Sequence, residues 1–249
     1  MSYSRITEDI NKHASTPEVV DSALGDIGVV EERMADMKVV ENKEENVLDI
    51  NTEKEVADEI VKPEKVVKHM LENAWTLWFF KNDKSRTWEE NQRPIITVTT
   101  VEDFWRLYNN ISVASRLPPG SDYSLFKEGI FPDWEDHRNA AGGRWIINVD
   151  RQHRVQVLDN YWLEILFYLI GEHAANLAHI VNGAVVNVRG KGDKLASVWM
   201  ADTGTNVIKV GKEIKQRLGI KEEQTIAFNT HREEKVRSHG GNNKKKYFV

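Results

Sequence analysis

The pattern of apolar and polar positions changes near residue 67 of the 249-residue chain. Residues 1–66 contain one aromatic residue, Tyr3, among many Glu, Lys, Asn and Asp residues. A segment of this composition cannot bury enough apolar surface to offset the entropy that is lost when it becomes ordered. We therefore predict a disordered acidic N-terminal extension over residues 1–66 and one folded domain over residues 67–249.

In the folded domain, runs of β-branched, aromatic and alternating apolar residues predict strands. The first run, AWTLWFFK at residues 74–81, is apolar enough to form a buried strand. Further strands are expected at residues 95–100, 123–126, 144–149, 184–189, 195–201 and 225–230. The segments 184–189 and 195–201 flank the tight turn GKGDK, so we expect them to pair as a hairpin.

Three segments have the spacing of helices. Apolar residues recur at i, i+3, i+4 and i+7 in Val101, Phe104, Trp105 and Tyr108. Thr99 and Glu102 have the spacing of a capping box for this helix. A second helix is predicted after Asp159 as its cap, and a third over residues 205–218, ending at Gly219. Strands interrupted by three separated helices predict an α+β fold, with the helices on one face of a mainly antiparallel sheet.

The sequence lacks the signatures of several kinds of chemistry. It contains no cysteine, which excludes disulfides, thiol catalysis and haem–thiolate sites. It also lacks the Gly-x-x-x-x-Gly-Lys-Ser/Thr phosphate loop and the motifs HExxH, GxSxG and GxGxxG. Its eight histidines are scattered without metal-ligand spacing, and carboxylate pairs such as Glu89–Glu90 are interpreted as a solvated face. We therefore expect a binding protein, with no enzymatic activity, no metal and no cofactor.

The charge is distributed unevenly along the chain. The formal net charge is −5, but residues 1–65 hold 17 Asp and Glu against 8 Lys and Arg, which leaves 22 acidic and 26 basic residues in the rest. The mildly basic body permits the binding of a small anion or a nucleic acid. An apolar run of about 18 residues, as a membrane helix would need, is absent, and no membrane association is expected.

Two of the eight tryptophans, Trp88 and Trp134, lie in polar loop sequences and not in the periodic core pattern. One interpretation is that each indole folds back and plugs an end of the sheet. The other is a clamp, in which two indole faces hold a flat base between them. Glu135 offers two acceptor oxygens, which match the N1–H and N2–H donors of guanine. Methylation of guanine at N7 makes the ring cationic, and indoles and a carboxylate then both favour it.

A basic hairpin supplies candidate ligands for phosphate. The two-residue period of a strand puts Asn187, Arg189 and Lys191 on one face, and Lys194 returns across the turn. Taken alone, these residues fit an ordinary exposed hairpin edge with solubilising lysines. Beside an aromatic clamp, the three cations are suited to a triphosphate.

Several motifs together resemble the translation initiation factor 4E family, whose members bind the 7-methylguanosine cap of messenger RNA. The motifs are WTLWFFKNDKSRTWEEN, TVEDFWRLYNNI, PPGSDYSLFKEGIFPDWEDHRNAAGGRW, YWLEILFYLIGE and GAVVNVRGKGDKLASVW. The resemblance implies a curved antiparallel sheet of about eight strands, backed on its convex face by three helices. It also implies that residues 67–249 form a cap-binding domain without catalytic activity.

Carried over residue by residue, the resemblance assigns cap binding to Trp88, Trp134, Glu135, Arg144, Arg189, Lys191, Lys194 and Trp199. The first two indoles would stack on the base, and Glu135 would recognise the guanine edge. Arg189 and Lys194 would contact the phosphates, with support from Arg144, and Asp122 would orient Arg189.

Trp199 is implied to lie near the N7 methyl group of the base. The segment LASVW has one residue more between Lys194 and Trp199 than the usual pattern of the family. Because successive side chains of a strand point to opposite faces, a slip of one residue would turn Trp199 away from the ligand. Both facings of Trp199 are compatible with the sequence.

The resemblance implies a second surface on the convex side. In the family it accepts a short helix of the form Tyr-x-x-x-x-Leu-apolar, presented by scaffold proteins of the initiation factor 4G type and by 4E-binding repressors. The corresponding positions are His69, Met70, Val101, Trp105, Leu163 and Phe167. Docking of a helix in a groove needs such apolar anchors a turn apart, although core packing would also explain them. Met70 stands where the family usually has proline, and Phe167 where an aliphatic residue is common.

The implied function is to bind capped messenger RNA in the cytoplasm, with a nuclear or RNA-granule pool also considered, and to recruit it to the initiation scaffold. An alternative, motivated by Met70 and Phe167, is a cap-binding translational repressor or transport factor that does not engage the scaffold. A cap-hydrolysing enzyme would need a glutamate-rich metal site, and the sequence offers no helix of that kind.

Overall fold

The computed structural model describes residues 67–149, 154–189, 194–233 and 247–249. The predicted disorder of residues 1–66 and the candidate phosphate ligand Lys191 therefore lie outside the described residues. Within them, eight strands form one sheet: β1 (Met70–Lys81), β2 (Gln92–Thr100), β3 (Ser121–Lys127), β4 (Gly143–Asn148), β5 (Val181–Asn187), β6 (Lys194–Met200), β7 (Ala227–Thr230) and β8 (Tyr247–Phe248).

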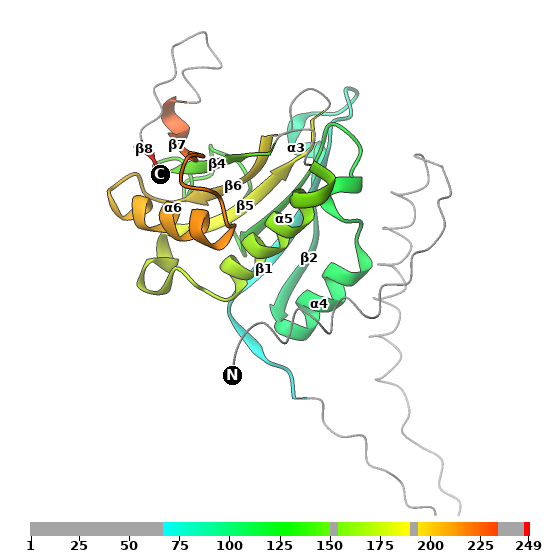
Figure 1. Ribbon diagram of the computed structural model, residues 1–249. Coiled ribbons are helices and arrows are strands. Elements are labelled where there is room, and N and C mark those ends of the chain that lie inside the picture. Colours follow the sequence, from blue (N-terminus) through cyan, green and yellow to red (C-terminus); the bar gives the residue numbers. More distant parts are fainter. Residues whose placement is uncertain (1–66, 150–153, 190–193, 234–246) are drawn as a thin grey trace, which may run out of the picture. The chain divides into compact units, whose positions relative to one another are not determined.

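Helices α4 (Val101–Asn110), α5 (Arg154–Ile170) and α6 (Asn206–Arg217) cover one face of the sheet (Figure 1). The chain also forms a single-turn helix, α3 (Trp88–Asn91), and short 3₁₀ segments at Ala114–Arg116 and Ala175–Ile180. The strand order is β2-β1-β3-β5-β6-β4-β7-β8, and neighbouring strands are antiparallel. The predicted α+β class, with helices on one face of an antiparallel sheet, is confirmed.

The register of the central strands determines which side chains share a face. Asp122 of β3 pairs with Phe80 of β1 on one side and with Asn187 of β5 on the other. Cross-strand partners point to the same face, so this row of side chains lies together on the sheet. Two residues further along β3, Ser124 pairs with Trp78 and Val185 and forms the next row.

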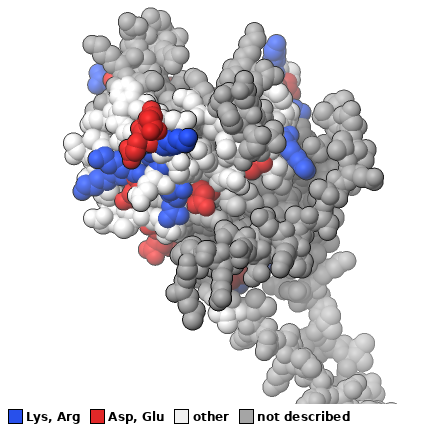
Figure 2. Space-filling view, in the orientation of Figure 1, with Lys and Arg blue, Asp and Glu red and all other residues white. Residues whose placement is uncertain are grey.

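The opposite face packs against the helices. Trp145 of β4 is completely buried, and its Nε1–H donates to the carbonyl oxygen of Val207 in α6, at 2.9 Å. A β-carbon at Gly211 of α6 would lie only 2.3 Å from the Trp145 ring, so this close approach requires glycine. On the outer side of the helices, charged side chains of both signs gather over α6 (Figure 2). No helix among the described residues is long and apolar enough to cross a membrane.

The predicted cap of the first helix was wrong by one residue. Thr100, and not Thr99, is the N-cap of α4, and its Oγ1 accepts the backbone N–H of Asp103 at 3.1 Å. The Thr–x–x–acid spacing occurs twice in this segment, so spacing alone does not choose between the two. Glu102, the expected partner of Thr99, instead accepts the backbone N–H and contacts the ring of His69.

The predicted start of the second helix was also wrong. Helix α5 begins at Arg154, so Asp159 lies inside the helix and does not cap it. The Asp159 carboxylate instead accepts the backbone N–H of Ser115 at 2.8 Å and its hydroxyl at 2.6 Å. A polar residue that resembled a helix cap therefore connects α5 to the neighbouring 3₁₀ segment.

Candidate ligand-binding site

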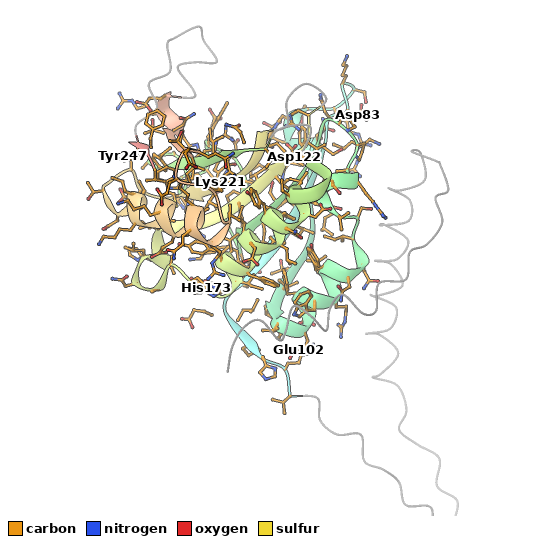
Figure 3. The ribbon with its side chains drawn as sticks, in the orientation of Figure 1. Asp83, Glu102, Asp122, His173, Lys221 and Tyr247 are labelled. Carbon is orange, nitrogen blue, oxygen red and sulfur yellow. The ribbon has the colours of Figure 1, made fainter. Side chains whose placement is uncertain are left out.

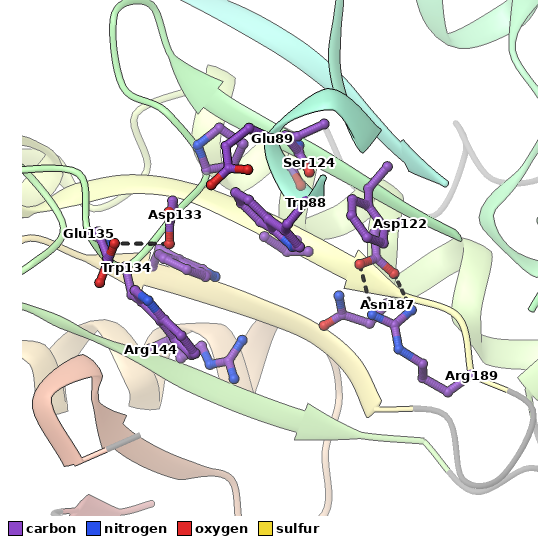
Figure 4. A pocket seen from close by; sticks show the side chains of 15 residues that line it. Trp88, Glu89, Asp122, Ser124, Asp133, Trp134, Glu135, Arg144, Asn187 and Arg189 are labelled. Carbon is purple, nitrogen blue, oxygen red and sulfur yellow. Dashed lines mark hydrogen bonds and ion pairs between the residues drawn. The ribbon is translucent and has the colours of Figure 1, made fainter. Parts of the chain in front are cut away.

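A pocket of about 600 Å³ opens on the sheet face opposite the helices. Arg144 lines it, whereas the next residue along β4, Trp145, points to α6, as strand alternation requires. The pocket is lined by Phe80, Trp88, Glu89, Gln92, Asp122, Ser124, Pro132, Asp133, Trp134, Glu135, Arg144, Val185, Asn187, Arg189 and Trp199 (Figure 4). The structure thus brings together most of the cap-binding residues expected from the sequence.

The sequence suggested that Trp88 lies in an irregular loop, but it belongs to the short helix α3. Thr87 forms a capping box with Glu90: the backbone N–H of Glu90 donates to Thr87 Oγ1, and the Glu90 carboxylate accepts the backbone N–H of Thr87. The buried Asn91 donates from its side-chain amide to the carbonyl oxygen of Asp83 at 2.9 Å. These bonds fix the backbone beneath the Trp88 indole, which is itself 41% exposed.

Trp134 lies in a loop whose backbone is held by hydrogen bonds to a buried side chain. Asn139 is completely buried, and its side-chain amide donates to the carbonyl oxygens of Phe131 at 3.0 Å and Asp133 at 2.8 Å. Asn182 of β5 in turn donates to the side-chain oxygen of Asn139 at 2.8 Å. The Trp134 indole packs against a small core cluster that consists of Phe126, Ile130, Val185 and Trp199. One side of the ring is therefore in contact with the protein.

Phe131, for which no role was expected from the sequence, connects the two tryptophan segments. Its ring lies edge-on to Trp88 at 6.0 Å between centroids and edge-on to Trp78 at 5.1 Å. Trp88 also contacts Phe80, at 6.1 Å. An apolar residue directly before Pro132 in a charged loop was the available signal that this side chain packs inward.

One end of the pocket is acidic. Glu135 lines it as expected, and so do Glu89 and Asp133, which precede or follow a clamp tryptophan in the sequence. The interpretation of Glu89 as part of a solvated face was therefore incomplete. The Oδ1 of Asp133 accepts the backbone N–H of Glu135 at 3.3 Å. Burial raises the pKa of Asp133, and the negative charges of Glu135 and Glu89 raise it further.

The other end of the pocket holds the guanidinium of Arg189, which is paired with Asp122. Both nitrogens of the Arg189 fork donate to Asp122, one of them to Oδ2 at 2.9 Å, so the guanidinium is held in a fixed orientation. Asp122 raises the pKa of Arg189. This contact agrees with the role expected for Asp122. Lys194 begins β6 opposite Asn148, and Lys191 lies outside the described residues.

Trp199 lines the floor of the pocket, which resolves the question that its spacing raised. The pairing of β4 with β6 skips one residue of β6: Ile146 pairs with Ser197, whereas Ile147 pairs with Leu195. This bulge absorbs the additional residue, and Trp199 keeps the facing of its cross-strand neighbour Arg144.

Beneath Trp199 lies a histidine that the sequence did not single out. The ring of His231 is 4.3 Å from the Trp199 ring, between centroids, and the residue is only 2% exposed. Burial, with a smaller effect of the Arg144 charge, lowers the pKa of His231 to about 3. His231 is therefore neutral at physiological pH and provides an uncharged support under the floor of the pocket.

The residues expected on the second surface lie around α4 and α5. Trp105 is 40% exposed, and its ring lies 5.5 Å from that of Phe167, between centroids. Val101 and Leu163 are partly buried, and Met70 is 72% exposed. In Figure 3, Glu102 at the start of α4 lies at the opposite end of the domain from Asp122. The two candidate sites are thus separate.

The described residues contain no group of three or more His, Cys, Asp or Glu side chains that is arranged to hold a metal ion. The acidic end of the pocket is instead positioned beside indoles, with a paired guanidinium at the far end. This arrangement is suited to recognising a flat, positively charged ring that carries an anionic substituent.

Comparisons with known proteins agree with this description. The family model for eukaryotic initiation factor 4E matches residues 70–246. Eukaryotic translation initiation factor 4E of Xenopus laevis is 46% identical over 215 residues, which is 86% of this chain and 100% of the Xenopus protein.

Solved structures of two proteins have similar folds. The structure of Ascaris suum eIF4E-3 with m2,2,7G cap has a TM-score of 0.69 and 43% identity, and the match covers 74% of this chain and 99% of that one. The same protein is also known with m7G cap. The structure of Caenorhabditis elegans eIF4E-3 with the 4E-binding protein Mextli and cap analog has a TM-score of 0.67 and 40% identity, and the match covers 74% of this chain and 100% of that one.

Proposed function

The chain belongs to the eukaryotic initiation factor 4E family, and we propose that it binds the 7-methylguanosine 5′ cap of messenger RNA through the pocket described above. The observation that carries the proposal is the polarity of this pocket: carboxylates and two indoles at one end, and an oriented guanidinium at the other (Figure 4). The cap has the complementary polarity, because its methylated base is cationic and its triphosphate is anionic.

In this proposal, Trp88 and Trp134 stack on the two faces of the base. Stacking contributes about 1–3 kcal/mol per base, and the cationic ring adds roughly 0.5–2 kcal/mol through the indole quadrupoles. Glu135 accepts N1–H and N2–H of guanine with its two oxygens. Trp199, on the pocket floor, lies near the N7 methyl group.

The phosphates are bound at the basic end. Arg189 is already oriented by Asp122, so little conformational entropy is lost when it meets a phosphate. We propose that Lys191 and Lys194 from the adjoining hairpin complete the phosphate contacts and that Arg144 supports them. Residues 67–249 form the cap-binding domain, residues 1–66 are an extension to it, and the domain binds its ligand without catalysing a reaction.

Retention on immobilised 7-methyl-GTP tests the proposal. The protein is expected to be retained and to elute with free 7-methyl-GTP, and Trp134→Ala or Glu135→Ala should abolish retention. Trp105→Ala is the matched control, because this exposed indole lies outside the pocket. Equal affinity of the wild-type protein for GTP and 7-methyl-GTP would contradict the proposed recognition of a cation.

We further propose that the surface around α4 and α5 recruits the bound messenger RNA to the initiation scaffold in the cytoplasm. The exposed Trp105 beside Phe167 supports docking of a Tyr-x-x-x-x-Leu-apolar helix. His69, Met70, Val101 and Leu163 complete this surface. The same surface would serve 4E-binding repressors, which compete with the scaffold.

An alternative is a cap-binding repressor or transport factor that does not engage the scaffold. It is favoured by Met70, which replaces the usual proline and is highly exposed. A pull-down with a scaffold peptide of the form Tyr-x-x-x-x-Leu-apolar distinguishes the two functions. Tight binding that Trp105→Ala abolishes supports recruitment, whereas cap binding without peptide binding supports the alternative.

A further inference from the structure

Two acidic residues that line the pocket have no assigned role in cap recognition. Glu89 directly follows Trp88, and Asp133 directly precedes Trp134. With Glu135 they form what we call the acidic collar, three carboxylates at the end of the pocket where the indoles lie (Figure 4). Each tryptophan segment thus brings at least one carboxylate to the place where a stacked ring would lie.

We propose that Glu89 and Asp133 determine the charge specificity of the site, by raising its affinity for a cationic purine above that for the same purine in neutral form. This inference rests on the proposed function and identifies which residues, beyond Glu135, set its preference for a methylated cap. Neither residue is required to donate or accept a hydrogen bond with the base. Both act through their charge.

The position of Asp133 supports a charge effect. Its carboxylate is half-buried and accepts the backbone N–H of Glu135, which fixes it beside the indole of Trp134. Partial burial lowers the local dielectric response, so a charge at this position acts over a longer range than a fully solvated one. Burial raises the pKa of Asp133, and the charges of Glu135 and Glu89 raise it further, so each of these two carboxylates interacts with that of Asp133.

The two arginines that line the pocket lie in different places. Arg189 lies at the end away from the acidic collar and is engaged in a fork with Asp122, whereas Arg144 lies beside Trp134, with its guanidinium carbon 5.6 Å from the centroid of the Trp199 ring (Figure 4). At the base end the three carboxylates of the acidic collar outnumber this one guanidinium, so the collar imposes a field along the pocket, from the base end to the phosphate end. A ligand with its positive ring at the acidic end and its phosphates at the basic end is aligned with this field.

The charge of the acidic collar affects a cationic guanine ring and a neutral one differently. A cationic ring gains attraction from each carboxylate, and across several ångströms of partly solvated pocket each charge is expected to change affinity by about three- to tenfold. A neutral guanine ring gains no such attraction, and the weak repulsion of the triphosphate by the same charges is common to both ligands. The ratio of the two affinities is therefore the quantity that the acidic collar controls.

The experiment uses Asp133→Asn, Glu89→Gln and the double variant of the full chain. Asparagine keeps an acceptor for the backbone N–H of Glu135 and removes only the charge. Dissociation constants for 7-methyl-GTP and GTP are measured by quenching of tryptophan fluorescence. Each single substitution should lower the ratio of the GTP constant to the 7-methyl-GTP constant by about three- to tenfold, and the double variant should lower it further.

Glu128→Gln is the matched control, since it removes one negative charge from the same β3–β4 connection but does not line the pocket. It should leave the ratio unchanged. A ratio that stays constant in all variants, or equal weakening of both ligands, would overturn the inference. If wild-type protein fails to distinguish the two ligands, the proposed function fails instead, so the two failures are separable.

Discussion

Acidification from pH 7.5 to pH 5 should destabilise the domain through His231, the histidine beneath the pocket floor. This residue is 2% exposed and its ring packs at a tilt against that of Trp199, and its pKa is lowered from 6.5 to about 3. Between these two values the unfolded chain binds a proton that the folded chain does not bind. Stability is therefore fully present above pH 6.5 and is lost as the pH falls toward 3.

The magnitude follows from the two pKa values. At pH 5 the unfolded histidine is almost entirely protonated and the folded one almost entirely neutral, so the proton stabilises the unfolded state by about 2 kcal/mol, at 1.36 kcal/mol per pKa unit. A typical domain is stable by about 5–15 kcal/mol, so this loss is readily measured. Carboxylates with lowered pKa values, such as Glu102 at about 2, titrate below this pH range.

The assay is urea unfolding of the wild-type protein and His231→Phe at pH 7.5 and pH 5. The phenylalanine variant keeps an aromatic ring under Trp199 and removes the titrating group, so most of the pH-dependent loss should disappear. An equal loss in both proteins would refute the reasoning. If the variant does not fold, the ring proton shifts of His231 in the wild-type protein provide the test, and a midpoint near 6.5 would contradict its burial as a neutral group.

Three further predictions concern the ligand and the fold. Asp122→Asn should weaken 7-methyl-GTP binding by roughly tenfold, because Arg189 loses a charged partner. Binding of 7-methylguanosine, which has no phosphates, should stay intact, and an equal loss for both ligands in a titration would indicate a general defect. A 2,2,7-trimethylated cap analogue should compete roughly tenfold more weakly than the monomethylated one, because its guanine no longer has N2–H groups to donate to Glu135. Comparable competition by the two analogues would contradict this prediction. Thr100→Ala should lower the free energy of unfolding by about 1 kcal/mol through loss of the α4 cap, whereas the exposed neighbour variant Thr99→Ala should change it little; the reverse order in urea unfolding would restore the cap first predicted.

The regular elements could be predicted because their signals are local. The i, i+3, i+4 and i+7 pattern from Val101 to Tyr108 gave a helix that the structure contains as α4, and the aromatic run at residues 74–81 lies in β1. Short elements carry too few periods to be recognised. Helix α3 is a single turn, and β8 has two residues, so neither was predicted.

The convergence of the site depends on pairings that no local pattern encodes. Asp122 and Arg189 are 67 residues apart along the chain, and they meet because β3 pairs with β5. The sequence suggested this contact only through its resemblance to a family. Glu89 was overlooked because a carboxylate beside another carboxylate usually marks a solvated surface. Its place at the pocket follows from the capping box that orients α3, in which Glu90 has the structural role.

The bulge in β6 has a consequence for how this hairpin can vary. A regular strand transmits every insertion to all residues beyond it, since each added residue reverses the side to which they point. The skipped position between Leu195 and Ser197 interrupts that transmission. This strand can therefore hold one additional residue near the GKGDK turn while the side chain of Trp199 keeps its orientation toward the pocket.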